Sequence, residues 1–465
     1  MIQLIASLIL PAAYGYLFLR CLWVNRPSGP YHRLAMAFMG LGLGFGLSSL
    51  AFFLTLPVPG SAASVVAELA LLLGGTVLCV AQDRRIRHQP RPPEIPGNDL
   101  PLLLRLVLVW TFALTLLGAG AYFVLSSLES PHAVWDAWAA WNNHARYLYY
   151  GGSDHYKNVF YPTVAVPDYP LLIPSLIARC WKFVGSTTTS IPILVAFLFT
   201  FASAGLLVAA VTIFRGRNQG LMAGLILLST YWFVQLGTYQ MADIPLAFYI
   251  LAAVVALALH EKYHDAHGLL IVTGLFVGLA TWTKVEGMLF AAALFVSVML
   301  VACRNQGVAA AAKSLAVLAG GFLPVFTVVL YTRMLLAPPG LVVTAQSVST
   351  NLTDARRAVA TLQEYPAALL RYFKRPLLLI AAFALLSGVH PNCELRGTKL
   401  TIILTIAFVL IGSYLVFLAL PESRYPLQFV VWRVFMELWP TAVFLVALYA
   451  RTPEDCLKPK QPPRT

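Results

Sequence analysis

Residues 135–141 read WDAWAAW and place one acid among three tryptophans, where a long apolar stretch gives way to polar sequence. Tryptophan rings stack on the apolar faces of sugars, and a carboxylate partly shielded from water can act as a general base. Asp136, flanked by Trp135 and Trp138, therefore predicts a site for a polar, sugar-like substrate. An aromatic belt at a membrane surface with one solvated acid is the alternative interpretation.

Two further acids stand next to prolines. Asp168 and Tyr169 lie between Pro167 and Pro170, which keep the backbone out of the helical region and can hold these side chains rigidly against a substrate. Asp243 precedes Ile244-Pro245 at the start of an apolar run. Both acids are also typical of helix N-caps, which is the default interpretation of each.

Basic residues near these acids are candidates for holding a phosphate. Lys284 is two residues from Glu286, so the two side chains either neutralise each other or leave Lys284 for a phosphate. Arg433 and Glu437 are four residues apart within an apolar helix and are expected to face one another. Ionisable groups inside a membrane span are costly and therefore mark functional sites, although a structural pair is the alternative.

Three more arginines are expected near the same side of the membrane and can also contact a lipid phosphate. The alternatives are a solvated helix face and contact with lipid head groups. These arginines are Arg356, Arg357 and Arg424.

The composition is that of an integral membrane protein. The 465 residues are 59% hydrophobic and 11% charged, with a mean hydropathy of +0.76. Backbone polar groups in lipid must pair internally, so an all-α bundle of roughly thirteen transmembrane helices is expected. The expected spans are 3–23, 34–56, 64–82, 101–127, 189–214, 219–237, 243–260, 268–283, 287–303, 314–337, 377–390, 399–420 and 430–450.

The net charge of +13 follows the topology and does not indicate nucleic-acid binding. Lys and Arg gather in alternate connections such as 83–100, whereas the short connections 57–63 and 237–242 contain none. This positive-inside pattern predicts an N-terminus outside, a cytoplasmic C-terminus, and the long loops 128–188 and 338–376 on the outer face. The candidate site would then face outwards.

The chain divides into segments by composition. A three-helix unit, 1–82, is followed by an Arg/Pro-rich cytoplasmic linker, 83–100, and by a membrane core, 101–337, that carries the first outer loop. The second outer loop, 338–376, has the periodicity of a helix lying on the membrane interface. The C-terminal helices, 377–450, and a basic tail, 451–465, complete the chain.

Several familiar motifs are missing. The sequence has no Walker A loop, GxSxG or HExxH, so a phosphorylated substrate is expected to arrive in the membrane rather than as a cytosolic nucleotide. The six cysteines show no CxxC spacing, which argues against a zinc site or a disulfide framework.

Together these residues resemble the membrane glycosyltransferases of the GT-C class. The likeness rests on an acid in the first large outer loop, then D-Y-P-L-L-x-P at 168–174, A-D-I-P at 242–245 and W-T-K-x-E-G at 282–287. It is strongest over residues 100–300, towards the protein O-mannosyltransferase and lipid A aminoarabinose transferase branch.

The resemblance implies a polyprenyl-phosphate sugar donor and an essential acid, matched here by Asp136. It further implies a bacterial-type inner membrane, an acceptor on the outer face, and membrane lipids as partners. By position Asp243, Lys284 and Glu286 match polar turns of the family, and the segments near Arg424 and Arg433 suit the donor phosphate. Some members need a metal, but no D-x-D pair is present, so no cofactor is expected. A multi-helix transporter or lipid flippase is the competing function, although its usual inverted repeats are not apparent.

Overall fold

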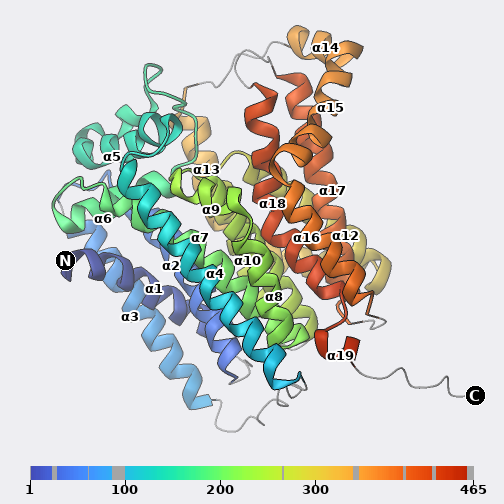
Figure 1. The fold of residues 1–465 in the computed structure, drawn as a ribbon. Helices are drawn as coiled ribbons and strands as arrows, with labels where there is room; N and C mark the ends of the chain where they lie inside the picture. The colour runs from blue at the N-terminus through green and yellow to red at the C-terminus, as the bar shows by residue number, and fades with distance from the viewer. Residues whose placement is uncertain are drawn as a thin grey trace, which may run out of the picture.

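The computed structural model describes residues 2–23, 29–60, 62–85, 100–263, 266–338, 345–390, 394–420 and 426–457 (Figure 1). Within these ranges the chain is built from helices and contains no strand, as expected. The membrane-length helices are α1 (Ile2–Leu22), α2 (Pro30–Thr55), α3 (Ala62–Arg85), α4 (Leu102–Glu129), α7 (Ser190–Arg215), α10 (Asp243–Lys262), α12 (Glu286–Gln306), α13 (Val308–Tyr331), α17 (Arg396–Ala419) and α18 (Leu427–Tyr449).

Shorter helices fill the connections. They are the π-helix η1 (Ala137–Trp141), α5 (Asn142–His155), the 3-10 helix η2 (Tyr156–Phe160), α6 (Leu172–Val184), α8 (Arg217–Leu228), α9 (Tyr231–Thr238), α11 (Gly268–Thr283), the π-helix η3 (Thr332–Leu336), α14 (Ala345–Thr353), α15 (Ala355–Tyr372), α16 (Lys374–Ser387) and α19 (Pro453–Leu457).

Ten helices of the described residues are long and apolar enough to cross a membrane, so the chain is an integral membrane protein. Three of the thirteen expected spans are not single helices of membrane length in the structure. The one at 219–237 is the pair α8 and α9, bent by 62° at a short break. The other two are α11, with 16 residues, and α16, with 14, both shorter than the ~20 residues of a typical span. The number thirteen is therefore not confirmed.

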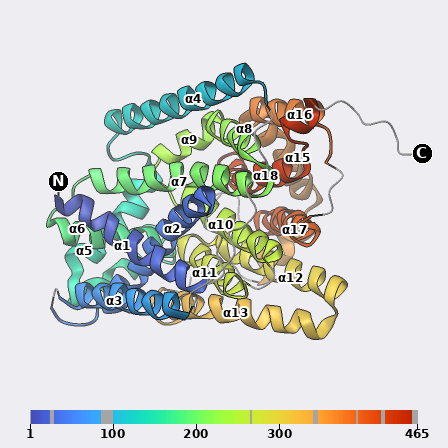
Figure 2. The same cartoon turned by 90° about the horizontal axis from the view of Figure 1, so that it is seen from below.

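Helix α10 lies at the centre of the bundle when the bundle is seen from below (Figure 2). In the most apolar stretch of α10, 94% of the residues are buried. In the corresponding stretch of α4, which lies at the periphery, 6% are buried. A helix that is apolar on all sides is buried on all sides. The alanines of α10, among them Ala252, Ala253 and Ala256, let its neighbours approach closely.

Helices α1 and α2 also touch closely, through glycine. A Cβ on Gly15 would lie 2.1 Å from the carbonyl oxygen of Gly40, and one on Gly44 would lie 1.8 Å from that of Pro11. The hydroxyl of Tyr249 on α10 donates to the Gly42 carbonyl at 2.9 Å. The three-helix unit expected at 1–82 is therefore packed directly on the central helix.

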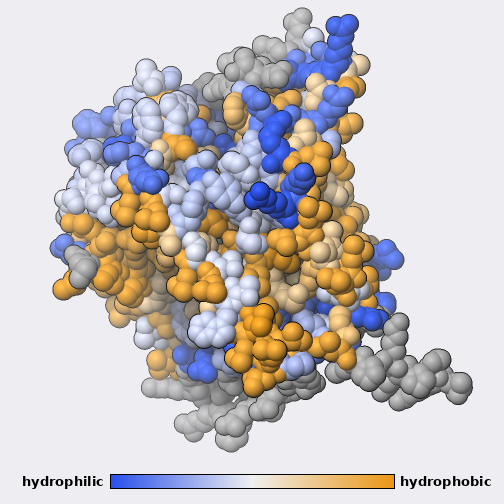
Figure 3. Space-filling view, in the orientation of Figure 1, coloured by the Kyte–Doolittle hydropathy of each residue, from blue (hydrophilic) through white to orange (hydrophobic). Residues whose placement is uncertain are grey.

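The two ends of the bundle differ in character. Helices α5 and α14 lie at one end, and α19 and the C-terminal end of α3 lie at the other (Figure 1). Hydrophilic residues gather towards the end with α5 and α15, while apolar residues cover much of the middle (Figure 3). The bundle therefore has an apolar middle, suited to a membrane, and one large polar end. We call this polar end, which carries α5, α14 and α15, the α5 end.

A buried ion pair fixes α6 beneath the α5 end. The guanidinium of Arg179 donates from Nε to Oε1 of Glu68 at 2.7 Å and from a second nitrogen to Oε2. The same guanidinium donates to the Ser7 carbonyl, and the Ser48 hydroxyl donates to Glu68. Both charged side chains are less than 5% exposed. The pair links α1, α2, α3 and α6.

We expect Arg179→Met to lower the free energy of unfolding by about 3–5 kcal/mol, because it leaves the Glu68 carboxylate buried without its cation. Chemical unfolding of the detergent-solubilised protein measures this change. The double variant Glu68→Leu/Arg179→Met removes both charges and should recover much of the loss. A double variant no more stable than the single one would contradict this account of the pair.

Candidate functional site

The centre of the site is a bidentate salt bridge between α18 and α10. Arg433 donates from Nε to Oδ1 of Asp243 at 2.8 Å and from a terminal nitrogen to Oδ2 at 2.9 Å. The Asp243 side chain is completely buried, and that of Arg433 is 16% exposed. A planar guanidinium matches a carboxylate in this way and adds direction to the charge attraction.

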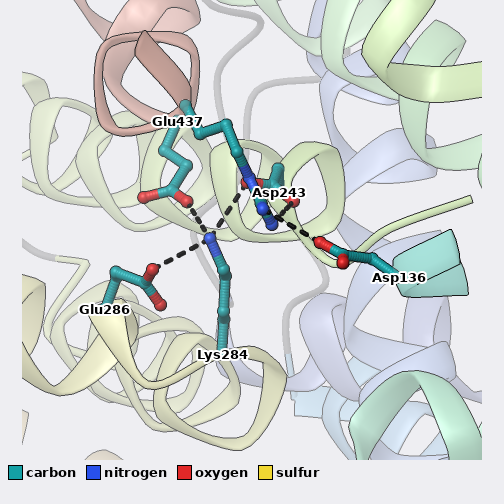
Figure 4. Close-up of polar contacts among 6 residues, drawn as sticks. Asp136, Asp243, Lys284, Glu286 and Glu437 are labelled. Carbon is teal, nitrogen blue, oxygen red and sulfur yellow. Dashed lines mark hydrogen bonds and ion pairs between the residues drawn. The ribbon is translucent and has the colours of Figure 1, made fainter. Parts of the chain in front are cut away.

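Lys284 lies on the other side of Asp243, in the turn between α11 and α12. Its Nζ donates to Asp243 at 2.9 Å and to Glu437 at 2.7 Å, and it lies 3.0 Å from a Glu286 oxygen (Figure 4). Burial alone would lower the pKa of Lys284, but the carboxylates of Asp243, Glu286 and Glu437 raise it above its ordinary value. The ammonium therefore stays charged, and it neutralises buried acids.

Asp136 joins the cluster from the segment 128–188, the predicted outer loop. Its Oδ2 accepts from a terminal nitrogen of Arg433 at 3.0 Å, and its side chain is 39% exposed (Figure 4). Arg433 thus connects a carboxylate open to solvent with one that is fully buried. Trp135 and Trp138 beside it are 60% and 48% exposed and pack edge to face, with ring centroids 6.4 Å apart. The arrangement offers an oriented acid next to an open aromatic surface.

Helix ends bring these groups together. Asp243 is the first residue of α10 and Glu286 the first of α12, where the helix dipole favours negative charge. Asp136 immediately precedes the π-helix η1, a conformation frequent at functional sites. Only Arg433 and Glu437 come from within a long helix, and both belong to α18.

Gln240 holds the outer loop against this cluster. Its backbone is left-handed, with φ of 52°, in the turn between α9 and α10. Its carboxamide accepts from Asn142 at 3.1 Å and donates to the Pro131 carbonyl at 3.2 Å. These two contacts bracket the segment that carries Asp136. A strained backbone held by such contacts is typical of a functional site.

Several predicted interactions have different partners in the structure. Neither Asp168 nor Asp243 caps a helix, because α6 and α10 begin without a side-chain cap. Asp168 instead lies 3.7 Å from Arg333 of η3, away from the Asp243 cluster. Arg433 and Glu437 face the same cluster, but each pairs with another helix or turn rather than with the other.

The remaining predicted residues lie elsewhere. Tyr169 packs on Trp141 at 5.4 Å between ring centroids. Arg357 donates to the carbonyls of Phe417, Leu418 and Leu420 at the end of α17. Arg356 stands beside it at the start of α15, where Asp354 caps the helix. Arg424 lies outside the described residues.

Two residues that hold predicted site residues in place, Arg333 and Gln240, were not predicted from the sequence. Arg333 has no spacing signal that links it to Asp168, which is distant in the chain. Gln240 lies two residues before Ala242, the first residue of the A-D-I-P motif, but no local pattern indicates its left-handed backbone. Among the described residues, no group of three or more His, Cys, Asp or Glu side chains is arranged to hold a metal ion.

Comparison with known protein families gave one match. Residues 168–331 match the family model described as dolichyl-phosphate-mannose-protein mannosyltransferase, in agreement with the resemblance of the D-Y-P, A-D-I-P and W-T-K-x-E-G motifs. No curated protein and no solved structure matched the chain. The match supports a membrane glycosyltransferase of the GT-C type. It includes Asp243, Lys284 and Glu286, while Asp136 and α18 lie outside it.

His144 predicts a pH dependence of the outer loop. Its ring is buried, Nε2 donates to the Ala165 carbonyl at 2.8 Å, and burial lowers its pKa from 6.5 to about 4. Between these two values only the unfolded chain binds the proton. Stability should therefore fall by about 1.4 kcal/mol per pH unit from pH 6.5 down to about pH 4, and be unaffected by this group above pH 6.5.

Thermal unfolding at several pH values, compared with His144→Gln, checks this expectation. Glutamine keeps a donor for Ala165 but does not titrate, so the variant should lose this part of the acid sensitivity. Equal acid sensitivity in both proteins would contradict it.

Proposed function

We propose that this chain transfers a sugar from a polyprenyl-phosphate donor to an acceptor at the α5 end of the bundle. The observation that carries the proposal is the chain of contacts from Asp136 through Arg433 to Asp243. It aims one accessible carboxylate at the polar end, beside exposed Trp135 and Trp138. The family match supplies the reaction class.

In this mechanism Asp136 is the general base. It accepts the proton of an acceptor hydroxyl while that oxygen attacks the anomeric carbon. The bond from this carbon to the phosphate oxygen breaks, and its electron pair leaves with the polyprenyl phosphate. A single displacement of this kind inverts the anomeric configuration. Trp135 and Trp138 would stack on the sugar and hold it for attack.

Arg433 would serve both the base and the leaving group. Three of its five N–H groups are used by Asp136 and Asp243, so two remain for a phosphate oxygen. Positive charge placed beforehand where negative charge develops stabilises the transition state. Lys284 is enclosed by Asp243, Glu286 and Glu437, so in this proposal it orients Asp243 and makes no contact with the donor.

The proposed topology puts the α5 end outside a bacterial-type inner membrane, with the N-terminus outside and the C-terminus in the cytoplasm. The basic connections at 83–100 and 451–465 support this orientation. We propose that no metal ion is required, because the cations Arg433 and Lys284 already neutralise Asp243. Asp168 with Tyr169, and Arg356 with Arg357, remain candidates for contacting the substrates.

We expect Asp136→Asn to lower turnover by about 10²–10⁴-fold, the usual contribution of a general base, while the protein stays folded. Mass spectrometry of lipids that co-purify with wild type and variant checks this. A glycosylated polyprenyl phosphate should accumulate on the variant. Glu129→Gln, an exposed acid at the end of α4, is the matched control and should behave as wild type. Equal turnover of Asp136→Asn and wild type would overturn the proposal.

We also expect Arg433→Lys to lower turnover by at least about tenfold although it keeps the charge, because an ammonium lacks the planar fork that spans Asp136 and Asp243. Mass spectrometry of the co-purifying lipids checks this variant as well. Since the substitution leaves Asp136 in place, a shift in the pH dependence of turnover should accompany the loss. A variant with normal turnover and an unchanged pH profile would show that charge alone suffices at this position.

A further inference from the structure

The segment between α4 and α6 contains a cavity with aromatic and polar side chains, built where α5 turns back on itself. Gly152 has φ of 56° and ψ of −146°, which breaks the helix and sends the chain into η2. A Cβ on Gly151 would lie 2.9 Å from the backbone nitrogen of Tyr156, so glycine is needed for this close return. The following residues then face the side of α5 that points away from the core.

The cavity has a volume of about 350 Å³, within the range of small-molecule sites. Its side chains are two phenols, two carboxamides, one guanidinium and one imidazole, with no aliphatic or acidic side chain among them. The lining residues are Asn143, Arg146, Tyr147, Tyr150, Gly151, His155 and Asn158. Much of the exposed lining is carbon, as suits stacking on the apolar face of a sugar, and the polar groups set in it can both donate to and accept from neighbouring hydroxyls.

The α5 face of the cavity follows from helical spacing. Positions 143, 146, 147 and 150 lie on one side of the helix, while Asn142, Ala145 and Leu148 are buried on the other. Tyr150 is held by an edge-to-face contact with Tyr149 and a 3.3 Å hydrogen bond with Thr187. These two contacts restrain the Tyr150 side chain, which is otherwise 71% exposed.

Arg146 supplies the charge of this cavity. Within the described part of the chain its guanidinium forms no ion pair and no hydrogen bond, in contrast to Arg179, Arg357 and Arg433. Guanidinium groups bind carboxylate and phosphate oxygens through paired hydrogen bonds. A half-buried arginine with free donors beside two tyrosines favours an anionic ligand with a flat, hydroxylated body.

We propose that this cavity binds a carbohydrate bearing a carboxylate or phosphate, and that it is the acceptor subsite of the transferase. The second clause rests on the proposed function. Asp136 and Arg146 are ten residues apart along η1 and α5, which corresponds to roughly 15 Å of helix. The acceptor is therefore an oligosaccharide that reaches from the cavity to Asp136, and not a single sugar.

Binding of trigalacturonate and of the neutral trisaccharide maltotriose to the purified full chain, without any donor, tests the site. We expect wild type to bind trigalacturonate at least about tenfold more tightly, as one charge-assisted contact provides. Arg146→Gln should remove this preference. Lys157→Gln makes the same change of charge on η2, outside the cavity lining, and should retain it.

Tyr147→Ala removes part of the wall without changing the charge and should weaken the binding of both saccharides. Thermal unfolding establishes that each variant is folded. The proposal is overturned if wild type does not prefer trigalacturonate, or if Arg146→Gln keeps the preference of wild type.

Asp136→Asn separates this site from the proposed reaction. It should keep the preference for trigalacturonate over maltotriose, which depends on Arg146, while losing transfer. Normal transfer by Asp136→Asn would refute the proposed mechanism and leave the binding site standing. Loss of transfer in Asp136→Asn, together with wild-type protein that shows no preference for trigalacturonate, would refute the acceptor site alone.

Discussion

The salt bridge between Arg433 and Asp243 determines the arrangement of the whole site. A fully buried carboxylate costs several kcal/mol unless cations and hydrogen bonds compensate it, and Asp243 receives both from Arg433 and Lys284. Removing either Arg433 or Lys284 would leave the remaining charged side chains in a low-dielectric interior with unbalanced charge. Helices α10 and α18 and the turn before α12 are therefore locked together. Asp136 is held by this locked group while remaining open to solvent.

The membrane explains why these charges gather at one end. Helix α10 is buried along nearly its whole length and carries alanine, valine and leucine on every side, so its interior offers no place for a charge. Its charged residues are confined to its ends, with Asp243 at the first position and Glu261 and Lys262 at the last two. The bend between α8 and α9 then brings the turn with Gln240 over the same end, where its carboxamide ties down the outer loop.

The long helices could be predicted from sequence, and Asp136, Asp243 and Arg433 could be named as candidates, because apolar length and charges in or beside a span are local signals. Their pairing could not. Arg433 meets Asp243 across 190 positions and Asp136 across 297, whereas spacing suggested Glu437 four residues away. The local sequence likewise suggested that Asp243 caps a helix. The spans predicted at α8–α9, α11 and α16 are not confirmed, because breaks and short helices depend on neighbouring packing.

The residues matched by the family model are separate from those of the loop that carries Asp136. This separation bears on substrate specificity. Residues 168–331 contain the buried Asp243, which holds Arg433, together with Lys284 and Glu286, which pair with each other beside it. Asp136, the tryptophans beside it and the α5 cavity all precede that segment and follow one another within 135–158. A rigid charged interior tolerates few changes, since each member compensates another. A loop built on it can change its side chains without disturbing that balance, so under the proposed function we expect acceptor choice to depend on residues 135–158.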